Sequence, residues 1–321
     1  MTPLRLAVIG AGPMGRLHAR AIGRRAARSG DCVLTSVVDR NLSRSAGVAA
    51  EFGGRAAQSL ESCWDEIDAA VVAVPTRSHA AVTRRMLERG LDVLVEKPMF
   101  ASVTEAEEML GLARDRGCIL GVGHVEWYNA ALQDAVARAG KPIRIEAERF
   151  NSQSDRGLDI DVIQDFMLHD LDWITRIVGS EIIDIQASGR TVVNGLLDEA
   201  EADLEFASGC HARLRASRVH EKRMRRVRIE GVLSTVEIDL LEEAGSRQEV
   251  GTQLRSQPGL ETLEPLDAEW ADFLAACRSR EAPENDAAVG LRAVEQVERV
   301  RQAILRSTGE SDHENDPALG G

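Results

Sequence analysis

The sequence feature that most constrains the fold is a glycine-rich loop that directly follows a short apolar run near the N-terminus. Residues 10–15 read Gly-Ala-Gly-Pro-Met-Gly and come after the run Leu4–Ile9. After a buried strand, Gly10 permits a tight turn, Gly12 lets the backbone approach a pyrophosphate, and Gly15 lets helix and strand pack closely. The amides at the start of the next helix then favour an anion. The loop residues expected at a dinucleotide are Gly10, Gly12, Pro13, Met14 and Gly15.

About the first 120 residues alternate short apolar runs with helix-like segments. Strands are expected at 4–9, 32–38, 68–74, 92–95 and 119–122, and helices at 13–29, at 78–89 and from Thr104, where Glu107 completes a capping box. Strands that alternate with helices imply parallel βαβ units. We therefore expect an α/β protein whose N-terminal domain, residues 1–122, is a doubly wound parallel sheet of the Rossmann type.

The second half has a different pattern, in which apolar and polar residues alternate with a period of two. Such runs lie at 143–150, 182–188, 202–206, 211–216, 226–230 and 235–240, with helices expected at 161–178, from about 267 and at 287–307. This period is typical of an antiparallel sheet with one covered face. We expect an α+β domain over residues 123–308 and a polar tail at 309–321. The other sheet face needs cover from the same chain or from a homodimer or homotetramer.

Charge and cysteine content disfavour several classes of partner and site. Lys and Arg number 39 against 52 Asp and Glu, and the resulting net charge of −13 disfavours nucleic acid and anionic membranes. The five cysteines are scattered and form no C-x-x-C pair, which favours reduced thiols in the cytoplasm. The N-terminal apolar run is too short for a signal peptide, and no run of about 18 apolar residues is present to span a membrane. The expected partner is therefore a small molecule.

An acidic residue follows the glycine loop at a distance that suits a dinucleotide site. Asp39 ends the second expected strand, 24 residues after Gly15. A carboxylate there accepts hydrogen bonds from both ribose hydroxyls and repels a 2′-phosphate, which favours NAD over NADP. Arg40, the next residue, is able to pair with a 2′-phosphate. The alternative for Asp39 is a solvated carboxylate at a strand end.

A lysine is expected at the edge of the sheet where ligands bind. Residues 94–98 read Leu-Val-Glu-Lys-Pro and place Glu96 and Lys97 at the carboxyl end of a parallel strand. An ammonium group facing a hydroxyl carbon polarises the oxygen as charge develops. The alternative is a surface lysine that pairs with Glu96.

The expected helix at 161–178 is mostly apolar but carries four polar side chains at helical spacing. Asp165, His169, Asp172 and Arg176 are four, three and four residues apart, which places them on one face of an α-helix. A carboxylate one turn from a histidine orients the imidazole, which can take an alcohol proton near neutral pH. The alternatives are a solvated charged face, two metal ligands or a core histidine. No third ligand at metal spacing is evident, so no metal is expected.

Four motifs occur in a fixed order along the chain. They are the glycine loop followed by Arg-Leu-His-Ala, then Ala-Val-Pro-Thr-Arg-Ser-His at 73–79, Glu-Lys-Pro at 96–98, and Asp-x-x-x-His-Asp at 165–170. Together they resemble the Gfo/Idh/MocA oxidoreductases, which include inositol and glucose-type dehydrogenases, from residue 4 to about residue 307. The resemblance implies NAD-dependent oxidation of a CH–OH group. It also implies a Rossmann domain followed by an open-faced, mostly antiparallel sheet.

The resemblance further implies roles for individual residues. Lys97 and His169 would flank the reacting hydroxyl with Asp165 beside them, His169 as the base and Lys97 polarising the oxygen. The positions implied to line the cofactor are Pro75, Thr76, His79, Glu96 and Lys97. The alternative for His79 is that it begins the next helix. Tyr128, the lone tyrosine, does not sit where family members with a catalytic tyrosine place theirs.

Two further segments resemble the UDP-N-acetylglucosamine 3-dehydrogenase branch of the family. Residues 123–129, Gly-His-Val-Glu-Trp-Tyr-Asn, are similar to the G-H-x-E-R-F-N segment of that branch, and 159–165 to its D-V-G-V-I-x-D run. The branch makes a 3-keto nucleotide sugar for amination in lipid A or polysaccharide routes. Trp127 and Tyr128 replace Arg-Phe, which puts a phosphate role for residue 127 in doubt.

Substrate contacts are expected at His124, Asn129, Arg156 and His169. Arg156 would contact a diphosphate, or else is an ordinary loop arginine. His124 and Asn129 would bind substrate or cofactor, or else cap a buried turn.

The sequence thus predicts an NAD-dependent enzyme that oxidises the C3 hydroxyl of a nucleotide sugar, with UDP-N-acetylglucosamine as the expected substrate. One alternative keeps this chemistry and changes the substrate to inositol or a monosaccharide. Another, of a different class, is a non-catalytic NAD-binding regulatory protein that kept the fold. The presence of Lys97, Asp165 and His169 favours an enzyme, because a sensor does not need them.

Overall fold

The computed structural model describes residues 2–152, 160–193, 195–241 and 263–308. The chain divides into two compact units, unit 1 with Met1–Ala130 and Leu260–Val294, and unit 2 with Ala131–Gly259 and Glu295–Gly321. The expected limits of 1–122 and 123–308 differ from these units because helix α7, Pro265–Ser279, packs against helix α1 within unit 1. The tail expected at 309–321 lies outside the described residues.

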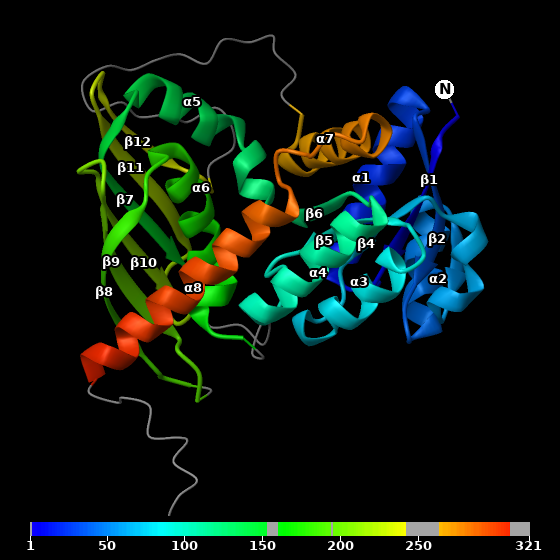
Figure 1. Ribbon diagram of the computed structural model, residues 1–321, viewed down its shortest axis with the longest axis horizontal. Helices are drawn as coiled ribbons and strands as arrows, with labels where there is room; N and C mark the ends of the chain where they lie inside the picture. The colour runs from blue at the N-terminus through cyan, green and yellow to red at the C-terminus, as the bar shows by residue number, and fades with distance from the viewer. Residues whose placement is uncertain (1, 153–159, 194, 242–262, 309–321) are drawn as a thin grey trace, which may run out of the picture. The chain divides into compact units, whose positions relative to one another are not determined.

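Unit 1 is built on a six-stranded parallel sheet in the order β3-β2-β1-β4-β5-β6 (Figure 1). Its strands are β1 Leu4–Ile9, β2 Cys32–Val38, β3 Arg55–Ala57, β4 Ala69–Val72, β5 Asp92–Glu96 and β6 Leu120–Gly123. The order turns back between β1 and β4, so the expected doubly wound parallel sheet is confirmed. Ligands of such sheets bind beyond the carboxyl ends of the strands at this switch point.

Helices cover both faces of this sheet because side chains alternate along each strand. Leu6 and Val8 of β1 lie in one apolar cluster with residues of α1, α2 and α7, and Ala7 and Ile9 lie in a second cluster with residues of α3 and α4. The helices of unit 1 are α1 Pro13–Ser29, α2 Leu42–Phe52, α3 His79–Leu87, α4 Val103–Arg116 and α7, with short turns at Leu60–Ser62, Trp64–Glu66, Thr76–Ser78 and Val125–Tyr128.

The start of α4 differs from the expected capping box. Ser102 caps the helix by accepting a hydrogen bond from the amide of Glu105, and the Glu105 carboxylate accepts one from the amide of Ala101. The box therefore lies two residues before the expected pair of Thr104 and Glu107. Both pairs have the same S/T-x-x-E spacing, so the pattern alone does not choose between them.

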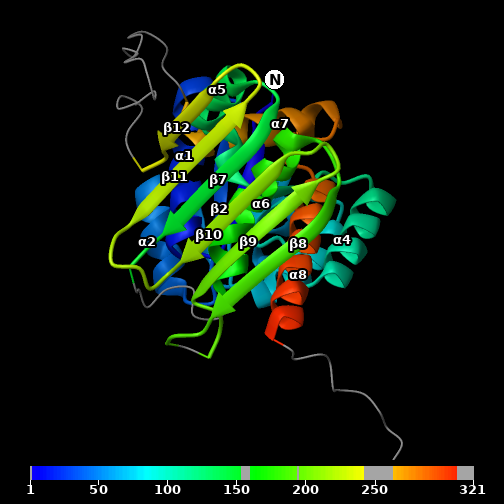
Figure 2. The same ribbon diagram turned by 90° about the vertical axis from the view of Figure 1, so that its left-hand side faces the viewer.

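Unit 2 contains a six-stranded sheet in the order β12-β11-β7-β10-β9-β8 (Figure 2). Its strands are β7 Pro142–Phe150, β8 Ile182–Arg190, β9 Glu199–Phe206, β10 His211–Ser217, β11 Met224–Gly231 and β12 Thr235–Asp239. Only the β7–β10 pair among them is parallel, so the expectation of a mostly antiparallel sheet is confirmed. Helices α5, Ala130–Ala139, and α6, Leu168–Val178, also belong here, and the division between the units falls inside α8, Ala287–Thr308.

The two faces of the unit 2 sheet differ in character. Ala212 and Leu214 of β10 are buried on the face that α6 covers, whereas Arg213 and Arg215 alternate with them on the other face. That face carries ion pairs, such as Arg213 with Asp203 at 2.8 Å. It is therefore charged rather than apolar.

No helix among the described residues combines the length and apolar character needed to cross a membrane.

Candidate active site

The glycine loop joins β1 to α1 and leaves open space at the start of the helix. Gly10 has a φ of +102°, and a Cβ at Gly10 or Gly15 would overlap a backbone carbonyl oxygen. At Gly12, the N-cap of α1, a Cβ would meet nothing within 4 Å, and no side chain caps the helix. Pro13 and Met14 form its first turn. This space and the uncapped helix start fit the pyrophosphate of a dinucleotide.

Asp39 follows β2 and fixes the glycine loop to the end of that strand. Its Oδ2 accepts a hydrogen bond from the amide of Ala11 at 2.8 Å, and its Oδ1 accepts one from the amide of Asn41 at 2.7 Å. The carboxylate thus lies beside the loop, at a position that suits the ribose hydroxyls of a dinucleotide. The sequence did not reveal the contact with Ala11. Arg40, next to it, is exposed.

His79 links two of the expected cofactor segments through its ring. It begins α3 and is buried, with Nε2 2.8 Å from the carbonyl oxygen of Val74 and Nδ1 3.0 Å from that of Pro98. Both ring nitrogens therefore face backbone. His79 holds the turn that contains Pro75 and Thr76 close to the turn that follows β5.

Lys97 follows β5 and is partly buried, while the preceding Glu96 is buried and turned into unit 1. The Lys97 amide donates a hydrogen bond to Glu96 Oε2 at 3.0 Å, and Glu96 Oε1 lies 2.7 Å from Nε2 of His18 on α1. Trp270 of α7 donates a hydrogen bond from Nε1 to His18 Nδ1 at 3.0 Å. His18 belongs to the Arg-Leu-His-Ala segment, which was a usable signal. Trp270 lies 252 residues further on, and no sequence signal marked it.

The expected helix at 161–178 begins with a π-helical turn, Ile163–Met167, before α6. Asp165 lies in this turn and His169 in the first turn of α6, and both are partly buried. The expected single face assumed α-helical spacing, which does not hold through the π turn. Asp172 is buried and pairs with Arg176 at 3.7 Å, so it belongs to no solvated face. Single π turns within helices are frequent at functional sites.

A buried ion pair anchors α6 to the sheet directly beside His169. Asp170 receives two hydrogen bonds of 2.9 Å from Arg149 on β7, and a third of 3.1 Å from Trp173 Nε1. The Arg149 and Asp170 side chains are 4% and 5% exposed. Because Asp170 is the residue after His169, this anchor fixes the backbone from which the imidazole projects.

The start of the π turn is fixed as well. Asp161 accepts a hydrogen bond from the amide of Gln164 at 2.9 Å and another from Arg301 of α8 at 2.7 Å. Arg218 pairs with the fully buried Asp198 and also donates to the carbonyl oxygen of Ile160 at 2.7 Å. Asp165 thus lies on a segment held at both ends.

The remaining expected substrate residues lie on or beyond β6. His124 is buried, and its carbonyl oxygen accepts a hydrogen bond from Asn285 at 2.9 Å. The Asn129 amide donates to Glu126 at 3.3 Å, which is the geometry of a side chain that closes a turn. Arg156 lies outside the described residues. Among the residues that are described, no three His, Cys, Asp or Glu side chains are grouped to hold a metal ion.

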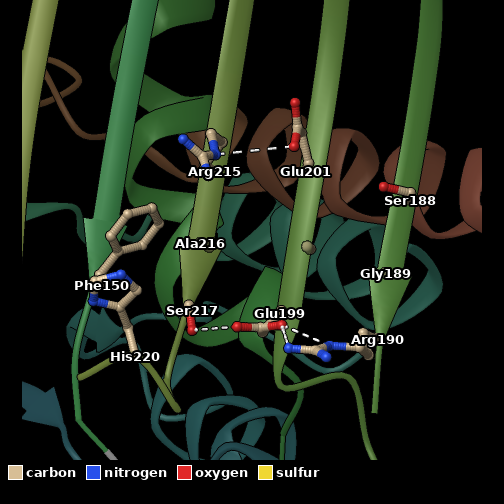
Figure 3. A pocket seen from close by; sticks show the side chains of 11 residues that line it. Phe150, Ser188, Gly189, Arg190, Glu199, Glu201, Arg215, Ala216, Ser217 and His220 are labelled. Carbon is tan, nitrogen blue, oxygen red and sulfur yellow. Dashed lines mark hydrogen bonds and ion pairs between the residues drawn. The ribbon is translucent and has the colours of Figure 1, made fainter. Parts of the chain in front are cut away.

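A separate cavity of about 250 Å³ lies on the charged face of the unit 2 sheet (Figure 3). Arg190 pairs there with Glu199, and the ring of His220 stacks on Phe150 at 4.6 Å between centroids. None of the expected site residues lines this cavity.

Family models match both units. Residues 4–124 match the oxidoreductase family with an NAD-binding Rossmann fold, and residues 130–237 match the GFO/IDH/MocA C-terminal domain. The chain is 34% identical over 313 residues to a UDP-N-acetylglucosamine 3-dehydrogenase from Acidithiobacillus ferrooxidans, covering 95% of this chain and 98% of the relative. It is 28% identical to a scyllo-inositol 2-dehydrogenase (NAD(+)) from Bacillus subtilis over 67% of each chain.

Solved structures give the same result. The Acidithiobacillus ferrooxidans enzyme superposes with a TM-score of 0.81 at 33% identity, covering 95% of this chain and 98% of that one. GenD2 from gentamicin A biosynthesis, solved in complex with NAD, has a TM-score of 0.81 at 21% identity over 96% of this chain and 95% of its own, a likeness of fold. With the expected motifs, the doubly wound sheet and both domain models in agreement, this chain belongs to the Gfo/Idh/MocA family of NAD-binding oxidoreductases.

Proposed function

We propose that this protein oxidises the C3 hydroxyl of a nucleotide sugar, with UDP-N-acetylglucosamine as the substrate to test first. The observation that carries the proposal is the 34% identity to an enzyme of that activity over nearly the full length of both chains. The inositol dehydrogenase relative matches less of the chain at lower identity. The 3-keto product would supply a step that transfers an amino group to C3.

NAD supplies the hydride acceptor for such a reaction, and the side chains of this chain handle the proton. In this proposal His169 takes the hydroxyl proton through an imidazole nitrogen. The ion pair of the neighbouring Asp170 holds the backbone of His169 in position for this step. Lys97 donates a hydrogen bond to the same oxygen and stabilises the charge that develops there. Asp165 orients the imidazole and stabilises its protonated form.

The cofactor contacts in this proposal come from the loops at the carboxyl ends of the unit 1 strands. The Gly12 region would hold the pyrophosphate and Asp39 the ribose, with Pro75 and Thr76 beside the cofactor. His124, Asn129 and Arg156 are the proposed substrate contacts.

The test is NADH formation with a panel of UDP-sugars and free cyclitols, each offered with NAD and with NADP. We expect turnover of UDP-N-acetylglucosamine with NAD and a C3 ketone in the product by NMR. Turnover of a free cyclitol alone would move the assignment to an inositol or monosaccharide dehydrogenase. NAD binding without turnover of any panel member would favour the regulatory alternative.

Matched variants test the proposed roles. Lys97→Ala and His169→Ala should bind NAD nearly as the wild type does but lose turnover by about 10²–10⁴-fold. Lys141→Ala and His211→Ala are the controls, because both residues are exposed and neither has a role in the proposed mechanism. Near-normal rates for both Lys97→Ala and His169→Ala would overturn the mechanism.

We also propose a cytoplasmic homodimer or homotetramer that binds neither nucleic acid nor membrane. The net charge of −13 and five free cysteines, four of them buried, support the location and the excluded partners. The charged sheet face gives no hydrophobic argument for a particular assembly. Light scattering coupled to size-exclusion chromatography measures the subunit number, and a monomer at micromolar concentration would contradict the assembly.

A further inference from the structure

A chain of hydrogen bonds runs through the interior of unit 1 and ends at Lys97. Trp270 donates to His18, His18 contacts Glu96, and Glu96 accepts a hydrogen bond from the Lys97 amide, at 3.0, 2.7 and 3.0 Å. Trp270 and His18 are completely buried, and Glu96 is 6% exposed. The three buried residues come from α7, α1 and β5, so the chain connects three separate elements beneath Lys97.

The donors in this chain fix the tautomer of His18. An indole N–H only donates, so His18 Nδ1 must accept the hydrogen bond from Trp270. Nδ1 therefore carries a lone pair, and the ring proton is on Nε2, which donates to Glu96. A neutral imidazole of this tautomer satisfies both contacts, and Glu96 accepts two hydrogen bonds as a carboxylate.

A second buried acid adjoins the chain. Glu269 precedes Trp270 on α7 and is 1% exposed. Burial, and after it the negative charge of Glu96, raise the pKa of Glu269 well above its usual value. The side-chain amide of Asn285 acts in the opposite direction. Burial and the nearby charge of Glu96 therefore favour the neutral form of the Glu269 carboxyl group.

Charged and polar groups on several elements act on these two carboxyl groups. His18 faces Glu96 from α1 and Lys97 follows it in sequence, while Asp272 on α7 adds negative charge near Glu269. On β6 the neighbour is Gly123, where a Cβ would lie 3.3 Å from the carboxylate carbon of Glu96. The Glu96 carboxylate is therefore a buried negative charge next to Lys97.

We propose that Trp270, His18 and Glu96 act as positioning residues that hold Lys97 in place for proton handling at the substrate hydroxyl. None of the three needs to touch the substrate. The carboxylate sets the direction of the Lys97 backbone through its amide and attracts the ammonium through its charge. Glu269, as a neutral acid, adds no second negative charge beside Glu96. This inference rests on the proposed function, because it assigns Lys97 a role at the reacting hydroxyl.

The kinetic test compares Glu96→Gln, His18→Leu and His18→Gln with the exposed control Glu88→Gln. Glu96→Gln and His18→Leu should lower kcat about 100-fold, as expected for a reacting group displaced by about 1 Å, while the Kd for NAD changes less than about threefold. His18→Gln should recover most of kcat, since its amide can donate from near the position of Nε2. The alkaline limb of the kcat–pH profile should move to lower pH in Glu96→Gln, because the Lys97 ammonium loses the negative charge beside it. The limb should stay in place in Glu88→Gln.

A spectroscopic test is independent of turnover. Nitrogen NMR of the full-length protein with isotope-labelled histidine should show His18 as the neutral Nε2–H tautomer, and Trp270→Phe should alter its signals. Infrared difference spectra should show the carbonyl stretch of a protonated carboxyl group that Glu269→Gln removes. A doubly protonated His18, or an Nδ1–H tautomer, would overturn the proposal even if a Glu96 variant failed to fold.

The outcomes separate the two proposals. Full activity in Lys97→Ala would overturn the proposed mechanism and with it this inference. Loss of activity in Lys97→Ala with a normal kcat and pH profile in Glu96→Gln and His18→Leu would leave the mechanism standing and overturn the inference alone.

Discussion

Removal of Asp170 should destabilise unit 2 much more than removal of a similar but exposed aspartate. In Asp170→Ala the Arg149 guanidinium stays buried while it loses two hydrogen bonds of 2.9 Å, and Trp173 loses its acceptor. Breaking a buried ion pair on one side costs about 3–5 kcal/mol, because the remaining charge stays desolvated after it has lost this partner. At about 2–4 °C per kcal/mol for a unit of this size, the thermal midpoint should fall by about 6–20 °C.

Asp203→Ala is the matched control for this experiment. Asp203 also pairs with an arginine through two hydrogen bonds, at 2.8 and 3.0 Å, but the Arg213 and Asp203 side chains are 53% and 47% exposed. Loss of an exposed pair costs about 0–1 kcal/mol, so the midpoint should fall by less than about 4 °C. Calorimetry at pH 7 measures both shifts. The double variant Arg149→Met with Asp170→Leu should recover most of the loss, because no buried charge remains. Similar small shifts for Asp170→Ala and Asp203→Ala would refute the argument from burial.

Three other predictions concern the cofactor loop and the buried thiols. Gly15→Ala should prevent correct folding of the loop, because its Cβ would overlap a carbonyl oxygen, whereas Gly12→Ala should fold normally and bind NAD more weakly. Calorimetric titration with NAD compares the two variants, and a normal NAD affinity in Gly15→Ala would contradict the argument from packing. Asp39→Asn should weaken NAD more than NADP, and equal loss of both in the same titration would show that the ribose is held elsewhere. Burial raises the pKa of Cys32 and of Cys210 from 9.0 to about 11, so the unfolded chain loses these protons first. The contribution of these two thiols to the free energy of unfolding should be fully present below pH 9 and be lost between pH 9 and about 11, as measured by urea unfolding. A Cys32→Ala, Cys210→Ala double variant whose free energy of unfolding falls equally steeply with pH over this range would contradict this.

Local signals made unit 1 predictable from the sequence. The bounds of α1, Pro13–Ser29, agree with the expected helix because proline at its first position and Gly30 in the left-handed conformation after it mark both ends. The π turn at Ile163–Met167 was not predictable, since an apolar helix with four polar residues reads as an ordinary α-helix. Strand β3 is only three residues long and has no apolar run of its own.

The candidate site was predictable where its residues follow strands and not where they meet in space. Asp39 and Lys97 each follow an apolar run, so their position at the sheet edge follows from the parallel topology. The contact of His18 with Trp270 joins residues 252 positions apart, and nothing in a single sequence pairs them. Burial decided the rest, because the direction in which Glu96 turns depends on packing against α1 and α7.

The discontinuous composition of unit 1 has a consequence for how the protein is made. During synthesis, residues 1–130 leave the ribosome long before α7, which supplies Trp270, Phe273 and Leu274 to one of the two apolar clusters on the parallel sheet. A nascent N-terminal segment therefore exposes part of that sheet face until the chain has been extended through about residue 294. A fragment cut at the end of β6 would contain every motif of the cofactor loop and still lack part of the core that supports it.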